Sequence, residues 1–129
     1  MSIHDKIVQG FENNNVEFIT TVPCKQLAGV IDGVEKSDSI FHIPSNNENE
    51  GMGLCAGAYM CGKRSAIIMQ NTAIGVTINT LATLIPYYYF PLPMLILYRG
   101  YFVAPVACQL VFPYTHLLLP TNRVFYMPF

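Results

Sequence analysis

The stretch His-Ile-Pro-Ser-Asn-Asn-Glu-Asn-Glu-Gly-Met-Gly-Leu-Cys-Ala-Gly-Ala-Tyr, residues 42–59, decides the fold of this chain. A short apolar strand ends at Pro44, and a polar turn leads into a helix with Glu48 and Glu50 in its first turn. The body of that helix consists mostly of glycine and alanine, which let another backbone or a flat ligand approach closely. The stretch therefore predicts a strand, a turn and a helix with two carboxylates at its mouth.

The two carboxylates have a structural interpretation and a catalytic one. Ser45 and Glu48 have the spacing of a capping box, and acidic side chains are favoured at a helix N-terminus in any case. A glutamate beside an apolar slot can also be tuned for proton transfer. Because the capping box would occupy Glu48, the spacing favours Glu50 for catalysis and leaves Glu48 as the second candidate.

Charge is distributed unevenly along the 129 residues. All eight acidic residues lie at or before Glu50, and after Arg99 only Arg123 is charged. The net charge of −1 gives no electrostatic basis for binding nucleic acid. Prolines and polar residues interrupt the apolar runs before they reach the ~20 residues of a membrane helix. We therefore expect no membrane span, and we expect the C-terminal half to be buried within the domain or against a partner chain.

The cysteines and the N-terminus indicate a cellular compartment. The four cysteines include no Cys-x-x-Cys pair and have no histidine at metal-ligand spacing, so the sequence predicts no metal site on this chain. The N-terminus lacks the apolar core of a signal peptide. These features predict reduced thiols in a cytoplasmic protein.

Helical and strand patterns alternate along the chain. They predict helices after Ser2, over 27–34, over 48–61 and over 74–85, and strands over 16–22, 40–43, 65–70 and 94–98. The last two strands are apolar without alternation, as in a parallel sheet that is covered on both faces. The predicted fold class is α/β, an open parallel sheet with helices on both faces.

In such sheets, ligands bind beyond the carboxyl ends of the strands. Those ends bring together Lys25, one of the two glutamates, Asn71 with Thr72, and Arg99. This set suits a small anion beside an acid–base group. The alternatives without a ligand are that Lys25 is a solvated side chain, that Asn71 caps the following helix, and that Arg99 forms a structural ion pair with a glutamate.

Four ordered blocks carry a family resemblance: residues 22–25, 48–51 with 55–59, 69–75 with 78–79, and 98–100. In order and spacing they resemble the alpha subunits of archaeal sulfopyruvate decarboxylase, which serves coenzyme M biosynthesis in methanogens. Phosphonopyruvate decarboxylase is similar at the same places. The resemblance covers residues 1–100, a pyrimidine-binding domain. Residues 101–129 form a divergent or truncated tail of the same domain, in which we expect no regular element.

The resemblance implies a thiamine diphosphate-binding fold of the pyrimidine type. In that family a glutamate hydrogen-bonds the aminopyrimidine ring and promotes the tautomer that activates the cofactor. Counting back from Tyr59 by the family's spacing gives Asn49, between the two glutamates, and the match of Glu50-Gly51 to the family's Glu-Gly favours Glu50. The diphosphate and Mg²⁺ would be held by a beta subunit, so the chain would work in a hetero-oligomer.

The resemblance also implies roles for individual residues and a reaction. Cofactor contacts would come from Glu50, Gly51, Gly53, Asn71 and Thr72, and substrate contacts from Lys25, Asn71 and Arg99. The reaction would be decarboxylation of 3-sulfopyruvate to sulfoacetaldehyde and CO₂, with no turnover without the partner. Two alternatives remain open: the same chemistry on phosphonopyruvate, and a non-catalytic interaction or regulatory remnant of the fold.

Overall fold

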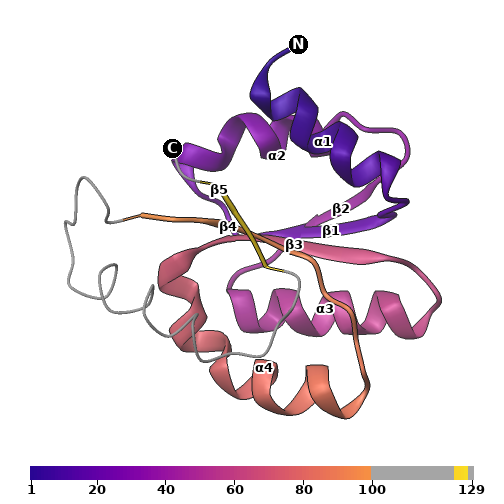
Figure 1. Ribbon diagram of the computed structural model, residues 1–129, viewed down its shortest axis with the longest axis vertical. Coiled ribbons are helices and arrows are strands. Elements are labelled where there is room, and N and C mark those ends of the chain that lie inside the picture. The colour runs from indigo at the N-terminus through magenta and orange to yellow at the C-terminus, as the bar shows by residue number, and fades with distance from the viewer. Residues whose placement is uncertain (100–123, 128–129) are drawn as a thin grey trace.

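The computed structural model describes residues 1–99 and 124–127. Its centre is a parallel sheet of five strands in the order β2-β1-β3-β4-β5 (Figure 1). The strands are β1 (Phe18–Thr21), β2 (Phe41–Pro44), β3 (Ser65–Gln70), β4 (Met94–Leu97) and β5 (Val124–Met127). The chain runs from β1 outward to β2 and then returns past β1 to β3. The strand order therefore reverses between β1 and β3, the position at which open α/β sheets bind ligands.

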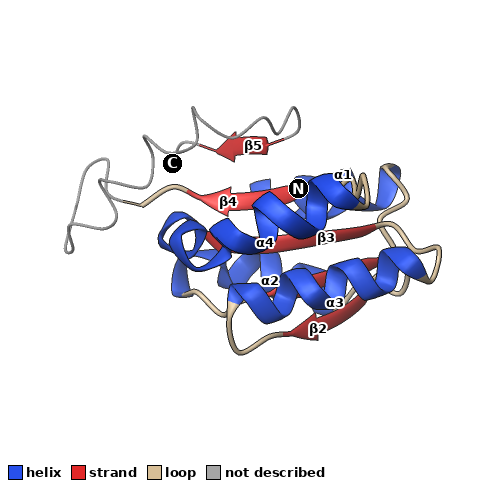
Figure 2. Ribbon diagram, turned by 90° about the horizontal axis from the view of Figure 1, so that it is seen from below, coloured by secondary structure: helices blue, strands red, loops and turns tan. Residues whose placement is uncertain are grey.

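Helices cover both faces of the sheet (Figures 1 and 2). One face carries α1 (Ile3–Asn13) and α2 (Ala28–Glu35), and the other carries α3 (Glu48–Met60) and α4 (Ile74–Tyr87). Short 3₁₀ turns, η1 (Lys25–Leu27) and η2 (Asn71–Ala73), lead into α2 and α4. The predicted fold class is confirmed. Among the described residues, no helix combines the length and apolar character needed to cross a bilayer.

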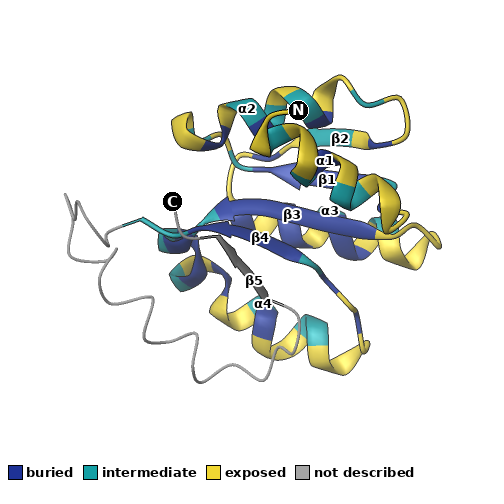
Figure 3. Cartoon of the chain, turned by 45° about the horizontal axis from the view of Figure 1, so that its top comes forward, coloured by how far each residue is buried: buried dark blue, intermediate teal, exposed yellow. Residues whose placement is uncertain are grey.

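Alternate residues of β3 supply two separate hydrophobic cores. Ala66 and Ile68 pack into the core under α1 and α2, whereas Ile67 and Met69 pack into the core under α3 and α4. All four side chains have no exposed surface, and Figure 3 shows β3 and β4 buried along most of their length. Burying one large aliphatic side chain contributes about 1.5–3 kcal/mol. The unbroken apolar runs were therefore correctly interpreted as strands covered on both faces.

The ends of the first and third helices follow the local sequence. Ser2 caps α1 in a capping box, because its hydroxyl accepts from the Asp5 N–H at 3.2 Å and the Asp5 carboxylate accepts from the Ser2 N–H at 2.7 Å. Gly62 follows α3 with a φ of +82°, a left-handed conformation that glycine adopts without strain. Both boundaries agree with the sequence-based prediction.

The C-terminal strand corrects one expectation. We expected no regular element after residue 100, but Val124–Met127 forms β5 and pairs in parallel with β4, from Met94 with Val124 to Leu97 with Met127. The segment Val-Phe-Tyr-Met has a strong preference for strands, and pairing covers the edge that β4 would otherwise expose. The rest of the predicted tail, 100–123 and 128–129, lies outside the described residues.

Candidate active site

The turn before α3 sets the roles of the two glutamates. Asn47 is the N-cap residue, and its side-chain oxygen accepts a hydrogen bond from the Glu50 N–H at 3.0 Å. The Glu50 carboxylate in turn accepts from the Asn46 N–H at 2.9 Å. Glu50 is exposed and is the acidic partner of the helix cap. The predicted capping box of Ser45 with Glu48 is therefore wrong, and the preference for Glu50 in catalysis that rested on it is lost, so that only the match of Glu50-Gly51 to the family's Glu-Gly still favours Glu50.

The overlap of two capping patterns explains this error. Ser45 with Glu48 and Asn47 with Glu50 have the same spacing, so the sequence alone cannot choose between them. In the structure, Ser45 still extends β2: its N–H donates to the Thr21 carbonyl at 2.9 Å, and its hydroxyl donates to the same oxygen at 3.4 Å. Because Ser45 is engaged with β1, the helix begins two residues later.

Glu48 is the buried carboxylate of the site. It is the first residue of α3, only 8% of its surface is exposed, and its carboxylate makes no hydrogen bond or ion pair with another described residue. The carboxylate oxygens keep some contact with solvent, since neither is among the fully buried side-chain atoms without a partner, and the positive end of the helix dipole favours a negative charge at this position. A buried, unpartnered carboxylate at the carboxyl edge of a parallel sheet is a candidate for contact with a ligand.

The glycines of α3 divide between packing and open surface. A Cβ at Gly51 would lie 2.9 Å from the Ser45 hydroxyl and 3.0 Å from Ile67 Cδ1, so glycine at this position lets the helix lie close to the sheet. A Cβ at Gly53 or Gly57 would meet nothing within 4 Å, and both residues are exposed. The sequence predicted a contact surface of small residues but could not show which glycines face inward.

Asn71 ties the ends of β3 and β4 together. It is fully buried; its amide nitrogen donates to the Arg99 carbonyl at 2.9 Å, and its amide oxygen accepts from the Arg99 N–H at 3.1 Å. No side-chain hydrogen bond caps η2 or α4, so the alternative role for Asn71 as a helix cap is not what the structure shows. Thr72 follows it in η2 and is half-buried.

The side chain of Arg99 is held by a residue that sequence reasoning missed. Its Nη1 donates to Oε1 of Gln70, the last residue of β3, at 2.9 Å. Among the described residues no carboxylate pairs with Arg99, so the expected alternative of a structural ion pair with a glutamate does not occur. Cys24, after β1, lies with its sulfur 3.9 Å from the same Gln70 oxygen. The position of Gln70 directly before Asn71 was the available signal.

The remaining predicted residue is Lys25, which begins η1 and is exposed. The structure thus places Cys24 beside Gln70, and Gln70 and Asn71 beside Arg99, on the two sides of the point where the strand order reverses. Glu48 lies at the same carboxyl edge, at the start of the helix that packs on β1 and β3.

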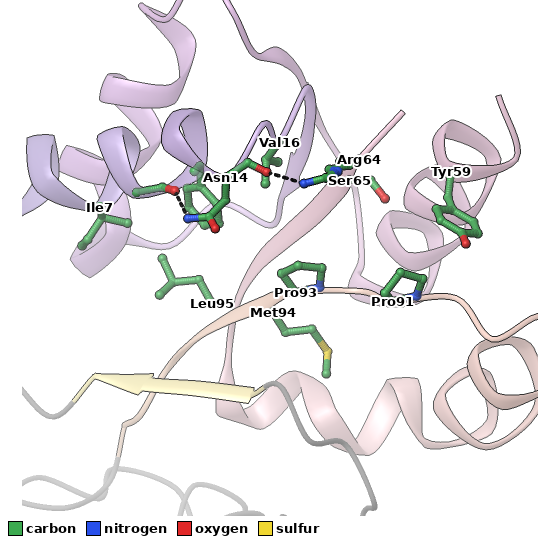
Figure 4. A pocket seen from close by; sticks show the side chains of 12 residues that line it. Ile7, Asn14, Val16, Tyr59, Arg64, Ser65, Pro91, Pro93, Met94 and Leu95 are labelled. Carbon is green, nitrogen blue, oxygen red and sulfur yellow. Dashed lines mark hydrogen bonds between the residues drawn. The ribbon is translucent and has the colours of Figure 1, made fainter. Parts of the chain in front are cut away.

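A cavity of about 770 Å³ lies at the opposite, amino edge of the sheet (Figure 4). Its lining is mainly apolar and comes from α1 and the loop after it, from the end of α3 and from the segments that begin β3 and β4: Ile7, Gly10, Phe11, Asn14, Val16, Tyr59, Arg64, Ser65, Pro91, Pro93, Met94 and Leu95. In Figure 4 the Arg64 guanidinium donates to the Asn14 carbonyl, at 3.1 Å. None of the predicted site residues lines this cavity, so it is separate from the site at the carboxyl edge.

Comparison with known proteins identifies the domain. Residues 1–101 match the family described as thiamine pyrophosphate enzyme, N-terminal TPP binding domain. The chain belongs to this thiamine pyrophosphate enzyme family. Membership confirms the resemblance predicted from the four sequence blocks, and it gives the carboxyl-edge residues their chemical context: the domain binds thiamine pyrophosphate, the same compound as thiamine diphosphate.

Three relatives of the chain carry the name sulfopyruvate decarboxylase subunit alpha. The protein of Methanothermobacter thermautotrophicus is 38% identical over 96 residues, 74% of this chain and 58% of that protein. That of Methanocaldococcus jannaschii is 39% identical over 94 residues, 73% of this chain and 56% of that protein. That of Methanococcus maripaludis is 32% identical over 127 residues, 98% of this chain and 76% of that protein. The chain therefore spans somewhat over half the length of the first two.

Proposed function

We propose that this chain provides the pyrimidine-binding part of a thiamine diphosphate-dependent decarboxylase of 3-sulfopyruvate. The products would be sulfoacetaldehyde and CO₂, in the coenzyme M biosynthesis of a methanogen and in its cytoplasm. Family membership and the names of the relatives support the proposal. The observation that carries it is Glu48, a largely buried residue at the start of α3 whose carboxylate has no partner among the described residues.

The residues at the carboxyl edge fit the aminopyrimidine end of thiamine diphosphate. That ring offers nitrogen atoms that need hydrogen-bonding partners, and Glu48 has a carboxylate without one among the described residues. The open surface at Gly53 leaves space for a flat ring or for the partner that covers it. Gly51, packed against the sheet, would contribute by letting α3 lie close to the sheet.

In this proposal, bound thiamine diphosphate supplies the electron sink that accepts the electron pair left when CO₂ departs. Glu48 would hydrogen-bond the pyrimidine ring nitrogen, and its position as a largely buried residue at the start of α3 would direct the carboxylate to that atom. Glu50 stabilises the helix start from which Glu48 projects. We thus assign the catalytic contact to Glu48 and a supporting role to Glu50.

The substrate is held by the other residues of the edge. Thr72 lines the reaction centre, and Asn71 fixes the backbone from which the Arg99 side chain extends. Arg99 and Lys25 are the cations for the acidic groups of the keto acid. Lys25, which is exposed, would meet the substrate on entry, whereas Arg99 is half-buried and would hold it in place.

A second subunit completes the proposed enzyme. The relatives are named as alpha subunits, which implies another subunit. We propose that this beta subunit holds the diphosphate group and its Mg²⁺. The exposed apolar residues of α3 and α4, among them Met60, Val76 and Tyr87, offer surface for such an association.

The test is reconstitution. The chain, a diphosphate-binding beta subunit, thiamine diphosphate and Mg²⁺ are mixed, and CO₂ release is followed with 3-sulfopyruvate, phosphonopyruvate and pyruvate. We expect turnover of 3-sulfopyruvate only in the complete mixture. Preference for phosphonopyruvate would select the alternative substrate. Failure of the complex to bind thiamine diphosphate in calorimetry would select the non-catalytic remnant instead.

A further inference from the structure

We propose that Gln70 determines specificity for a doubly acidic substrate, because it orients the Arg99 guanidinium without neutralising it. This inference rests on the proposed function and deepens it. It assigns Arg99 to the acid group remote from the bond that breaks, a sulfonate or phosphonate, and it makes Gln70 the residue that keeps the charge of Arg99 available.

Three hydrogen bonds fix Arg99 at the end of β4. Its backbone N–H and carbonyl are bound by the Asn71 amide at 3.1 and 2.9 Å, and its guanidinium is bound by Gln70 at 2.9 Å. Both partners follow one another at the end of β3, the neighbouring strand. A long, flexible cationic side chain is thus held in one place before any ligand binds, which lowers the entropic cost of binding.

The partner that holds the cation is neutral. All acidic residues of the chain lie at or before Glu50, and no described carboxylate forms an ion pair with Arg99. A half-buried guanidinium without a carboxylate has a charge that an incoming anion can satisfy. Structural arginines in such surroundings usually have an acidic partner, so the choice of an amide points to a ligand.

The hydrogen-bond donors of Gln70 and Arg99 match the needs of an oxyanion ligand. A guanidinium has only donors, so the atom of Gln70 that faces it is the oxygen. The amide nitrogen of Gln70 makes no hydrogen bond to another described residue, and neither do the other guanidinium nitrogens of Arg99. Several N–H groups from two adjacent side chains are therefore available to the three oxygens of a sulfonate or phosphonate.

The chemistry of decarboxylation decides which acid group Arg99 holds. A cation paired with the carboxylate that leaves as CO₂ would stabilise the substrate more than the transition state, in which that charge moves into the cofactor. A cation paired with the remote acid group binds substrate and transition state equally and does not slow the reaction. The same pair discriminates against a keto acid that lacks the second charge.

The test uses the reconstituted complex with Gln70→Glu. Glutamate has the same length but forms an ion pair with Arg99 and cancels its charge. We expect KM for 3-sulfopyruvate to rise about 10- to 100-fold, as for loss of a charge-assisted hydrogen bond, with kcat changed less than about threefold. KM for pyruvate, which has no second acid group, should stay within about twofold.

The matched control is Gln26→Glu. Gln26 is exposed in η1 and is not a partner of Arg99. The substitution therefore introduces the same charge nearby without touching the guanidinium. We expect this variant to behave as the wild type with both substrates. Equal increases of KM for 3-sulfopyruvate and pyruvate in Gln70→Glu, or no increase for either, would overturn the inference.

A binding measurement separates this inference from the proposed function. The full chain is titrated with methanesulfonate and with methylphosphonate while the Arg99 Nε–H resonance is followed by NMR. We expect a saturable shift in the wild type that Gln70→Glu abolishes. If the complex has no decarboxylase activity but this shift is present, the proposed function fails and the anion site stands. If the complex is active and the shift is absent, the anion site fails.

Discussion

The side-chain amide of Asn71 closes two hydrogen bonds with the backbone of Arg99, one from its nitrogen at 2.9 Å and one to its oxygen at 3.1 Å. This bridge joins the end of β3 to the end of β4 across the carboxyl edge of the sheet. It therefore fixes the backbone from which the cation of the site extends, and it uses the amide that the sequence had suggested for ligand contact.

Replacing Asn71 with alanine should lower the free energy of unfolding by about 2–4 kcal/mol. The variant leaves a backbone N–H and a carbonyl without their partner, each at a cost of about 1–3 kcal/mol if they stay buried. Urea denaturation measures the difference. Asn79→Ala, at an exposed position of α4, is the control and should change the value by less than about 0.5 kcal/mol. Equal, small effects would show that the bridge does not stabilise the edge.

Gly51→Ala and Gly53→Ala should have opposite effects on stability. A Cβ at Gly51 would face the sheet at contact distance, so the methyl group of alanine should lower the free energy of unfolding by about 1–3 kcal/mol through overpacking. The Gly53 side is open, so alanine should stabilise the exposed helix by about 0.5–1 kcal/mol. In the complex, Gly53→Ala should still weaken thiamine diphosphate binding. Destabilisation by both variants would contradict the assignment of the faces.

Some features of the fold follow from local sequence patterns, and others depend on long-range contacts. The runs around Ile67 and Leu95 are apolar at every position, and only a strand covered on both faces satisfies that pattern, so the fold could be predicted. The first residue of α3 could not be predicted, because Ser45 and Asn47 are both possible N-caps and each has a glutamate three residues later. Only the engagement of Ser45 with Thr21, a long-range contact, decides between them.

The site was predicted by position rather than by contact. Asn71 and Arg99 were correctly predicted to be neighbours at one edge of the sheet, because both follow strands and parallel strands end on the same side. Gln70 was missed because it reads as the last residue of a buried strand, and its role depends on which neighbour its side chain meets. The strand Val124–Met127 was missed because pairing with β4 is a long-range contact.

Stability should fall below about pH 6.5 because of His42. Burial lowers the pKa of His42 from its usual 6.5, and the Glu35 carboxylate, 3.6 Å away, opposes this only in part. The unfolded chain then binds a proton in a pH range where the folded chain does not, so the free energy of unfolding decreases as the pH falls through that range. The stabilisation is fully present above the unfolded pKa.

The measurement compares urea denaturation of the wild type and His42→Asn at about pH 7.5 and about pH 5.5. The variant cannot take up this proton, so it should lose less stability between the two values than the wild type. His42 also hydrogen-bonds Thr21 at 2.9 Å, and the variant is therefore expected to be less stable at the higher pH. Parallel pH dependences in the two proteins would exclude His42 as the source.

The thiols should differ in reactivity by their burial. Cys55 is fully buried on the inner face of α3, its sulfur donates to the Ala66 carbonyl at 3.3 Å, and burial raises its pKa to about 12. Cys61, after the helix, is exposed. Alkylation mapped by mass spectrometry should label Cys61 within minutes and Cys55 only as the chain unfolds, because the thiolate is the reactive species. Early labelling of Cys55 in the folded chain would contradict its placement.

We propose Glu48, and not Glu50, as the carboxylate that acts on the cofactor. Glu48 is buried without a partner, whereas Glu50 is exposed and caps α3. A glutamine at 50 can still accept from the Asn46 N–H, so Glu50→Gln should cost the chain only about 0.3–1 kcal/mol of stability through the lost helix-end charge. Glu48 also lies in the first turn of α3, so Glu48→Gln should have a similarly small effect on stability.

The most direct test measures kcat of the reconstituted complex with Glu48→Gln and with Glu50→Gln, each at saturating thiamine diphosphate. We expect Glu48→Gln to lower kcat by about 10²- to 10⁴-fold, the usual contribution of a general acid–base group, and Glu50→Gln to stay within about threefold of the wild type. Full activity in Glu48→Gln, or loss of activity in Glu50→Gln alone, would contradict this assignment.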